Sequence, residues 1–223
     1  MNTIKFIAMH HAGGLGTDRY ASTQDLTAQH INNAHRARWD FLSSLGHYGG
    51  YSFFIDKNGY ITQFRAIGEE TAAQIGHNFD TVSICIAGNF VKKNGVPIDI
   101  PTEAQKRTTC KLLSALTGGK IDLSLPPLQA IPGAIIQLDP SSIHHHSFYQ
   151  ISTECDCLPD AYWRDLLKES DVPPPATKES PPQAVLGLVD AIIALLTQLK
   201  EHLKVVFSQK KVGSVDRAHC GDL

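Results

Sequence analysis

A proline-rich stretch in the C-terminal half sets the limits of what this chain can fold into. Residues 172–182 read Val-Pro-Pro-Pro-Ala-Thr-Lys-Glu-Ser-Pro-Pro. Proline fixes φ and lacks a backbone N–H, so such a stretch favours extended polyproline geometry and cannot build a packed core. We therefore expect a folded domain over residues 1–171, a linker over residues 172–182 and a separate segment over residues 183–223.

The segment after the linker carries apolar residues at alternating three- and four-residue steps, which is the spacing of a coiled-coil seam. The seam consists of Val185, Leu188, Ile192, Leu195, Leu199 and Val206, with His202 at one further position. Asp190 interrupts the stretch and Lys200-Glu201 ends it before about 20 apolar residues accumulate, which disfavours a membrane span. The pattern predicts a C-terminal helix that makes a homo-oligomer or binds a target.

Strand and helix patterns alternate within residues 1–171. Apolar runs at residues 4–9 and 81–87 predict buried strands, and Asn58-Gly59 inside residues 51–64 predicts a hairpin with a tight turn. Helical patterns cover residues 23–41, 102–119 and 159–168. The order predicts an α/β fold, with a mixed central β-sheet flanked by helices. The proline-rich residues 121–142 fit no element.

Composition excludes several classes of protein. Lys and Arg total 20 against 22 for Asp and Glu, so no strong positive field favours nucleic acid or an anionic membrane. Five cysteines at irregular spacings argue against a disulfide framework. The first apolar run is too short for a signal peptide and lacks a small-residue cleavage site, so we expect a chain that is cytoplasmic as synthesised.

Histidines gather in two places, His10-His11 and His144-His145-His146. His10 follows the first predicted strand, where side chains emerge at a sheet edge. The second group shares a short loop with Cys155 and Cys157, and cysteine near several histidines in a cytosolic chain indicates metal binding more than a disulfide. Two imidazoles and one thiolate leave a fourth zinc position for water, whereas Cys157 as a fourth ligand would close the site as a structural one.

Six motifs then occur in a fixed order. They are Ile7-Ala-Met-His-His-Ala-Gly13, Gly50-Tyr-Ser-Phe-Phe-Ile-Asp-Lys-Asn-Gly59, Ile75-Gly-His-Asn78, Ser83-Ile-Cys-Ile-Ala-Gly-Asn89, Pro101-Thr-Glu-Ala-Gln105, and the stretch from His145 to Thr153-Glu-Cys155. Each motif is weak alone, but together they resemble the type 2 N-acetylmuramoyl-L-alanine amidases, the family of the phage lysozyme-type amidases and the peptidoglycan recognition proteins. The resemblance covers about residues 3–169.

The resemblance implies a zinc ion held by two histidines and a cysteine, which match His10, His145 and Cys155. His145 is chosen because the interval between this histidine and the cysteine is commonly eight or ten residues in the family. Tyr51 matches a tyrosine that assists the attacking water, and Thr153 matches a residue that supports the oxyanion.

Other correspondences are less direct. His77 matches a histidine that lines the substrate cleft of the family. His35 and Trp39 match family residues on the first helix, but we assign them to packing and not to catalysis, because a histidine or tryptophan on a helix face usually packs.

Two ligand positions have alternatives. His144 or His146 would replace His145 if the loop register differs. The family usually continues Cys-Pro-Gly, whereas this chain reads Cys155-Asp-Cys157-Leu-Pro, so an alignment on the proline would choose Cys157. Thr153-Glu-Cys155 reproduces the family's Thr-x-Cys and favours Cys155.

The implied reaction is hydrolysis of the amide bond between N-acetylmuramic acid and L-alanine of the peptidoglycan stem. Without a signal peptide, the expected setting is an endolysin that reaches the cell wall after a holin opens the membrane. A cytoplasmic amidase that recycles wall fragments would share the same residues. A non-catalytic peptidoglycan-binding module would lack the cysteine ligand, so Cys155 counts against it.

Overall fold

The computed structural model describes residues 3–14, 16–118, 125–149, 158–168 and 200. The chain divides into two units, Met1–Val172 and Pro173–Leu223. The expected linker lies outside the described residues, as do Thr153, Cys155 and all of the expected C-terminal helix except Lys200. Within the part that is described, no helix is long and apolar enough to cross a membrane.

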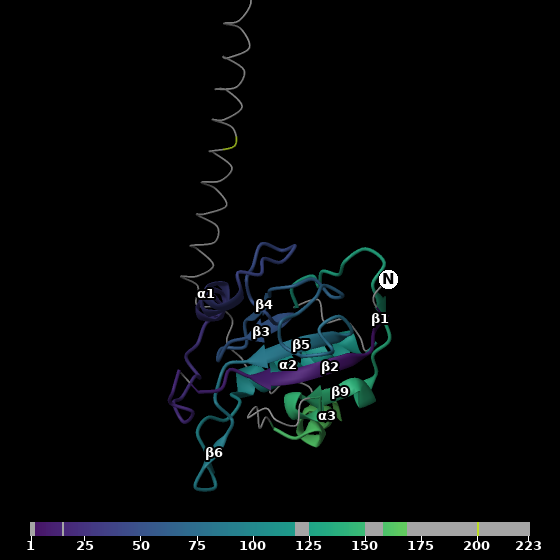
Figure 1. Ribbon diagram of the computed structural model, residues 1–223. Coiled ribbons are helices and arrows are strands. Elements are labelled where there is room, and N and C mark those ends of the chain that lie inside the picture. The colour runs from purple at the N-terminus through teal and green to yellow at the C-terminus, as the bar shows by residue number, and fades with distance from the viewer. Residues whose placement is uncertain (1–2, 15, 119–124, 150–157, 169–199, 201–223) are drawn as a thin grey trace, which may run out of the picture. The chain divides into compact units, whose positions relative to one another are not determined.

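A five-stranded mixed sheet forms the centre of the first unit, in the order β4-β3-β5-β2-β9 (Figure 1). Its strands are β2 (Phe6–His11), β3 (Phe53–Ile55), β4 (Ile61–Gln63), β5 (Thr81–Ile86) and β9 (Ile143–His145). Strands β3, β5, β2 and β9 run parallel, and β4 pairs antiparallel with β3. The predicted α/β fold with a mixed sheet is confirmed, as are the hairpin and the buried strand at residues 81–86.

Among the described residues, three helices and several short elements complete the unit. They are α1 (Ala28–Trp39), α2 (Glu103–Leu116), α3 (Asp160–Lys168), the 3-10 turns η1 (Pro140–Ser142) and η2 (His146–Phe148), and the strand pairs β1 (Thr3–Ile4) with β8 (Ile135–Ile136) and β6 (Lys92–Lys93) with β7 (Val96–Pro97). The segment that fitted no element in the sequence thus supplies β8 and η1.

Side-chain hydrogen bonds to free backbone N–H groups mark where the helices begin. At α2, Thr102 Oγ1 accepts from the backbone N–H of Gln105, and the Gln105 side chain accepts from the N–H of Thr102. The predicted start of α1 at residue 23 was wrong, because the helix begins after Thr27. Thr23 does not cap the helix: its backbone N–H donates to Asp99 and its hydroxyl to the carbonyl of Gly13.

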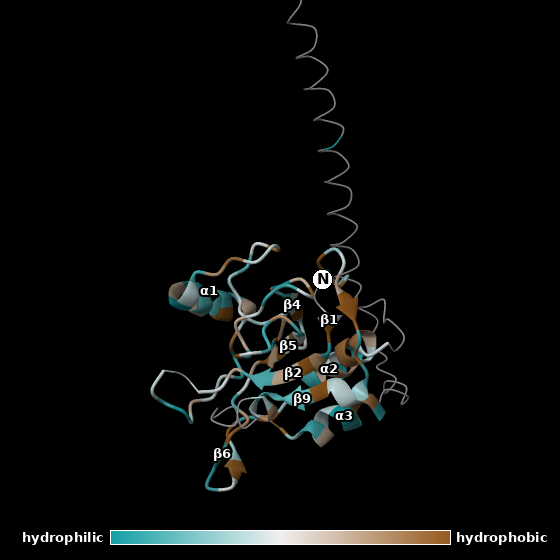
Figure 2. Cartoon of the chain, turned by 45° about the vertical axis from the view of Figure 1, so that its right-hand side comes forward, coloured by the Kyte–Doolittle hydropathy of each residue, from teal (hydrophilic) through white to brown (hydrophobic). Residues whose placement is uncertain are grey.

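The two faces of the sheet carry different side chains, because residues alternate along a strand. One face is apolar and packs against α2 and α3, where Leu112, Leu113 and Trp163 are buried. The other face carries a smaller cluster of Phe54 and Cys85 with Ile31 of α1. Figure 2 shows the apolar strands between α1 on one side and α2 with α3 on the other.

Candidate active site

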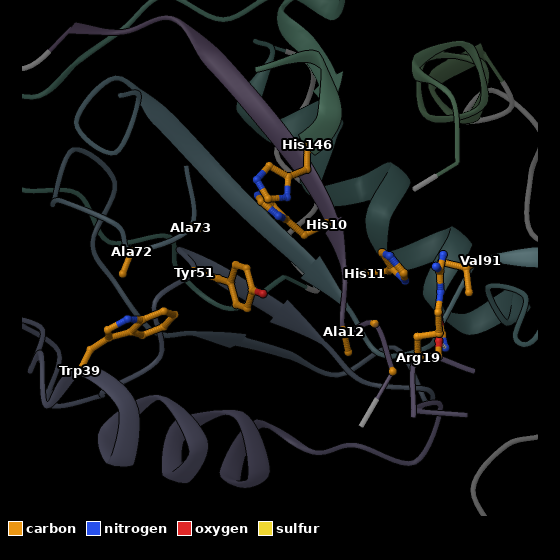
Figure 3. A pocket seen from close by; sticks show the side chains of 13 residues that line it. His10, His11, Ala12, Arg19, Trp39, Tyr51, Ala72, Ala73, Val91 and His146 are labelled. Carbon is orange, nitrogen blue, oxygen red and sulfur yellow. Dashed lines mark hydrogen bonds between the residues drawn. The ribbon is translucent and has the colours of Figure 1, made fainter. Parts of the chain in front are cut away.

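Two histidines meet at the carboxyl ends of β2 and β9. The register pairs Ala8 with His144 and Met9 with His145, so the next residue, His146, comes level with His10. Residues that are level on adjacent strands point to the same face. The ring centroids of His10 and His146 lie 4.4 Å apart, and Figure 3 shows the two rings side by side.

Tyr51 lies beside this pair at the end of the loop that enters β3. Its ring centroid is 5.2 Å from that of His10. The three aromatic side chains line a pocket of about 360 Å³ (Figure 3). The other lining residues are His11, Ala12, Gly13, Gly14, Arg19, Trp39, Ala72, Ala73, Asn89 and Val91. His10 and Tyr51, which the sequence motifs had singled out, thus line the same pocket.

His145, the predicted middle ligand, lies elsewhere. It is paired with Met9, a residue of the helix-covered face, and its ring Nδ1 is 2.5 Å from Oδ1 of Asp160 at the start of α3. The structure thus brings His146, one of the two alternatives, next to His10. The choice of His145 still rests on the family interval alone, and its described contacts are with α3.

Asp160 is a strong acceptor in this region. Burial raises the pKa of Asp160, but hydrogen bonds from the ring and backbone of His145 and from His144 outweigh burial and hold the pKa below its ordinary value. A carboxylate only accepts, so Nδ1 of His144 and of His145 each carries a proton. Both rings are therefore held by one charged group.

His77, predicted to line the substrate cleft, lies near the opposite end of the sheet. Its Nδ1 is 3.2 Å from Asp80, the residue before β5, and its ring contacts those of Phe6 and Tyr149. Phe6 begins β2, whereas His10 stands near its end. His77 does not belong to the residues that line the pocket described above.

His35 and Trp39, which the sequence assigned to packing, build the wall behind Tyr51. The His35 ring lies 5.3 Å from that of Tyr51 and 4.6 Å from that of Trp39, and Trp39 lines the pocket. The N–H of Gly50 donates to His35 Nδ1 at 2.8 Å. A Cβ at Gly50 would stand 3.2 Å from the Trp39 ring and 3.3 Å from His35, so a glycine suits this close approach.

The environment of His35 predicts an acid-sensitive stability. Burial, followed by the charges of Arg38 and Arg65, lowers the pKa of His35 to about 4. The unfolded chain, with a His35 pKa near 6.5, binds the proton first, so the contribution of His35 to stability falls as pH drops from about 7 towards 4 and is constant below. With allowance for partial solvent exposure, we expect a loss of about 2 kcal/mol.

The measurement is thermal unfolding at pH 7.5, 6, 5 and 4 in the wild type and in His35→Gln, whose amide oxygen can still accept from Gly50. The variant should lose less stability over this range than the wild type. Equal losses in the two proteins would show that His35 does not carry this pH dependence.

His10 and His146, at the ends of β2 and β9, supply part of a metal site. His146 Nε2 is buried and has no hydrogen-bond partner among the residues described, and the neighbouring His10 supplies a second imidazole. Imidazole nitrogens suit zinc. Within the described ranges no group of three or more histidine, cysteine or acidic side chains is arranged to hold a metal ion, and Cys155, the third ligand predicted from the sequence, lies outside them.

A family model for N-acetylmuramoyl-L-alanine amidases matches residues 1–157. This match spans most of the chain, so the chain belongs to that family. No curated protein sequence matches it.

Similar solved structures include a bacterial amidase and an insect peptidoglycan recognition protein. The N-acetylmuramoyl-L-alanine amidase LysC from Clostridium intestinale URNW is 18% identical, with 76% of this chain and 87% of that chain covered and a TM-score of 0.49. The Drosophila peptidoglycan recognition protein SA is 19% identical, with coverages of 71% and 76% and a TM-score of 0.45.

Proposed function

We propose that this protein is a zinc-dependent, endolysin-like amidase that hydrolyses the bond between N-acetylmuramic acid and the L-alanine of the stem peptide. Membership of the amidase family supports the reaction class. The observation that carries the site is the pairing of His10 with His146 at the end of the sheet, inside a pocket that Tyr51 also lines.

The proposed zinc ligands are His10, His146 and Cys155, with His145 as the alternative that the family interval favours. A histidine pair and a thiolate leave one position open, and zinc bound there would lower the pKa of a water molecule to about 7 and polarise the substrate carbonyl. The buried and unpartnered Nε2 of His146 among the described residues supports a ligand role.

The protein's own groups would orient the reactants. Tyr51, whose ring stands beside His10, would hold the attacking water with its hydroxyl, and His35 supports the Tyr51 ring from behind. Thr153 is the proposed donor to the oxyanion, where a hydrogen bond strengthens as charge develops. His77 remains a proposed contact for a distant part of the substrate.

The expected setting is a cell-wall lytic enzyme that is synthesised in the cytoplasm and reaches peptidoglycan after a holin opens the membrane. The linker at residues 172–182 and the helix at residues 183–223 would hold copies together or bind a target on the wall. Recycling of small wall fragments is the rival role. Intact sacculi and soluble muropeptides distinguish the two, since an endolysin should prefer sacculi.

Metal removal provides the direct test. Purified protein should hold about one zinc per chain and release peptides with N-terminal L-alanine from sacculi. Dialysis against a chelator should abolish the release, and added zinc should restore it. Full activity of the metal-free protein would contradict the proposal, and zinc binding without any hydrolysis would favour a binding module.

Cysteine variants serve as the matched pair in this assay. Cys155→Ala should lose zinc and activity together, because a thiolate ligand is removed. Cys157→Ala should retain both. The opposite result would show that Cys157, and not Cys155, is the third ligand.

A further inference from the structure

Strand β9 lies at the edge of the sheet, and side chains of α3 bind its outer backbone groups. Arg164 donates to the carbonyl of Ile143, with Nη2 at 2.8 Å and Nε at 3.2 Å. Asp160 Oδ1 accepts the backbone N–H of His145 at 2.6 Å. Two side chains one helical turn apart thus occupy the place of a neighbouring strand and satisfy an edge that would otherwise be unpaired.

Asp160 also binds the side chains of this strand. Its Oδ1 lies 2.5 Å from Nδ1 of His145, and its Oδ2 lies 2.9 Å from Nδ1 of His144 and 3.4 Å from Nη2 of Arg164. Hydrogen bonds to an ionised group are stronger than neutral ones. One carboxylate therefore fixes the backbone and both rings of the two residues that immediately precede His146.

Helix α3 is itself firmly anchored, so Asp160 is a fixed reference point. Trp163 is completely buried, and its indole N–H donates to the carbonyl of Leu158 at 3.0 Å. Leu166 packs in the same core, and its carbonyl accepts from Cys110 Sγ on α2. The acidic side chain in the first turn of α3 also suits the positive end of the helix dipole.

We propose that Asp160 is a positioning residue that holds the backbone ahead of His146, so that the His146 imidazole stands over His10 before metal binds. The metal's identity rests on the proposed function. Among the described contacts, the His146 carbonyl accepts from Gln74 and from the N–H of Tyr149. Neither contact fixes the residues on the N-terminal side of His146. Strand β2 binds the inner backbone groups of those residues, and Asp160 and Arg164 bind the outer ones. A ligand held in place beforehand loses less conformational freedom on binding.

The test measures zinc affinity of the full-length metal-free protein by competition with a chromophoric chelator. Asp160→Ala should weaken zinc binding by about 10- to 100-fold, the usual effect of removing an outer-sphere partner of a metal site. Asp160→Asn keeps one carbonyl oxygen for the His145 N–H and should fall between Asp160→Ala and the wild type. Asp165→Asn, an exposed carboxylate of the same helix that pairs with Lys168, is the matched control and should bind zinc as the wild type does.

Thermal unfolding of each metal-free variant separates positioning from folding. A residue that only anchors α3 would lower the melting temperature and leave the zinc dissociation constant of the folded protein unchanged, and that result would overturn the inference. If Asp160→Ala does not fold, Asp160→Asn decides by the same criterion. A wild-type protein that binds no zinc would refute the proposed function along with this inference, whereas tight wild-type binding with equally tight binding by the variants would refute the inference alone.

Discussion

On the proposed zinc-dependent reaction, replacing His146 with alanine is expected to remove zinc from the purified protein and to lower amidase activity by about 10³-fold or more, because the charge stabilisation and activated water that zinc would supply are lost together. His146 is the histidine whose ring faces His10, at a centroid distance of 4.4 Å. Zinc content by atomic absorption and peptide release from sacculi measure the two losses.

The informative control is the neighbouring residue. His145→Asn retains a side-chain N–H that can donate to Asp160, so zinc should stay bound and activity should fall by less than about 100-fold. If His145→Asn instead loses zinc while His146→Ala retains it, then the family interval identifies the ligand and the register of β9 does not.

This choice between adjacent histidines shows where sequence reasoning stops. The spacing to Cys155 selects His145, but the pairing of β9 with β2 decides which side chain points to which face. Nothing in three consecutive histidines predicts a strand, and the segment was interpreted as a loop. β9 forms because β2 on one side and α3 on the other supply partners for its backbone, and such partners are distant in sequence.

Local signals were sufficient elsewhere in the fold. Asn58-Gly59 predicts the β3–β4 turn, where Gly59 adopts a φ of 83°. The capping pair of Thr102 and Gln105 marks the start of α2. The start of α1 was predicted too early because threonine is a common N-cap residue. The backbone N–H of Thr23 instead donates to Asp99, a residue that is distant in sequence.

Some residues of the candidate site could be identified from the sequence, and others could not. His10 and Tyr51 were identified from motifs and share the pocket. Trp39 also lines that pocket, although we had assigned it to packing. The sequence of a polar helix does not indicate which structure a tryptophan at its end will contact. The position of His77 beside Asp80 likewise depends on where the strands begin, which its motif does not specify.

Arg65 is a buried residue that the sequence did not single out. Its side chain has no solvent-exposed area. The guanidinium donates to three backbone carbonyls, with Nε to Gly49 at 2.8 Å, Nη1 to Glu70 at 3.1 Å and Nη2 to Phe41 at 2.5 Å. Its Nη1 also lies 3.9 Å from the carboxylate of Glu69. One side chain thus joins the loop before Tyr51 to the loop after β4.

We expect Arg65→Met to destabilise the protein by about 3–5 kcal/mol, because one buried and two partly buried carbonyls lose the charged donor that they share. For a domain of this size the melting temperature should fall by roughly 10 °C. Arg65→Lys should recover only part of the loss, since an ammonium group does not reproduce the planar arrangement of donors. Arg107→Met, at an exposed position of α2, is the control and should stay within about 0.5 kcal/mol of the wild type.

The same substitution tests whether the pocket depends on this loop. Gly49 is two residues before Tyr51, and Gly50 donates to His35, so loss of the Arg65 contact frees the backbone that carries Tyr51. Assayed below its melting temperature, folded Arg65→Met should therefore bind zinc normally through its histidines but hydrolyse substrate more slowly. Unchanged turnover in the folded variant would show that the Arg65 contact with Gly49 does not position Tyr51.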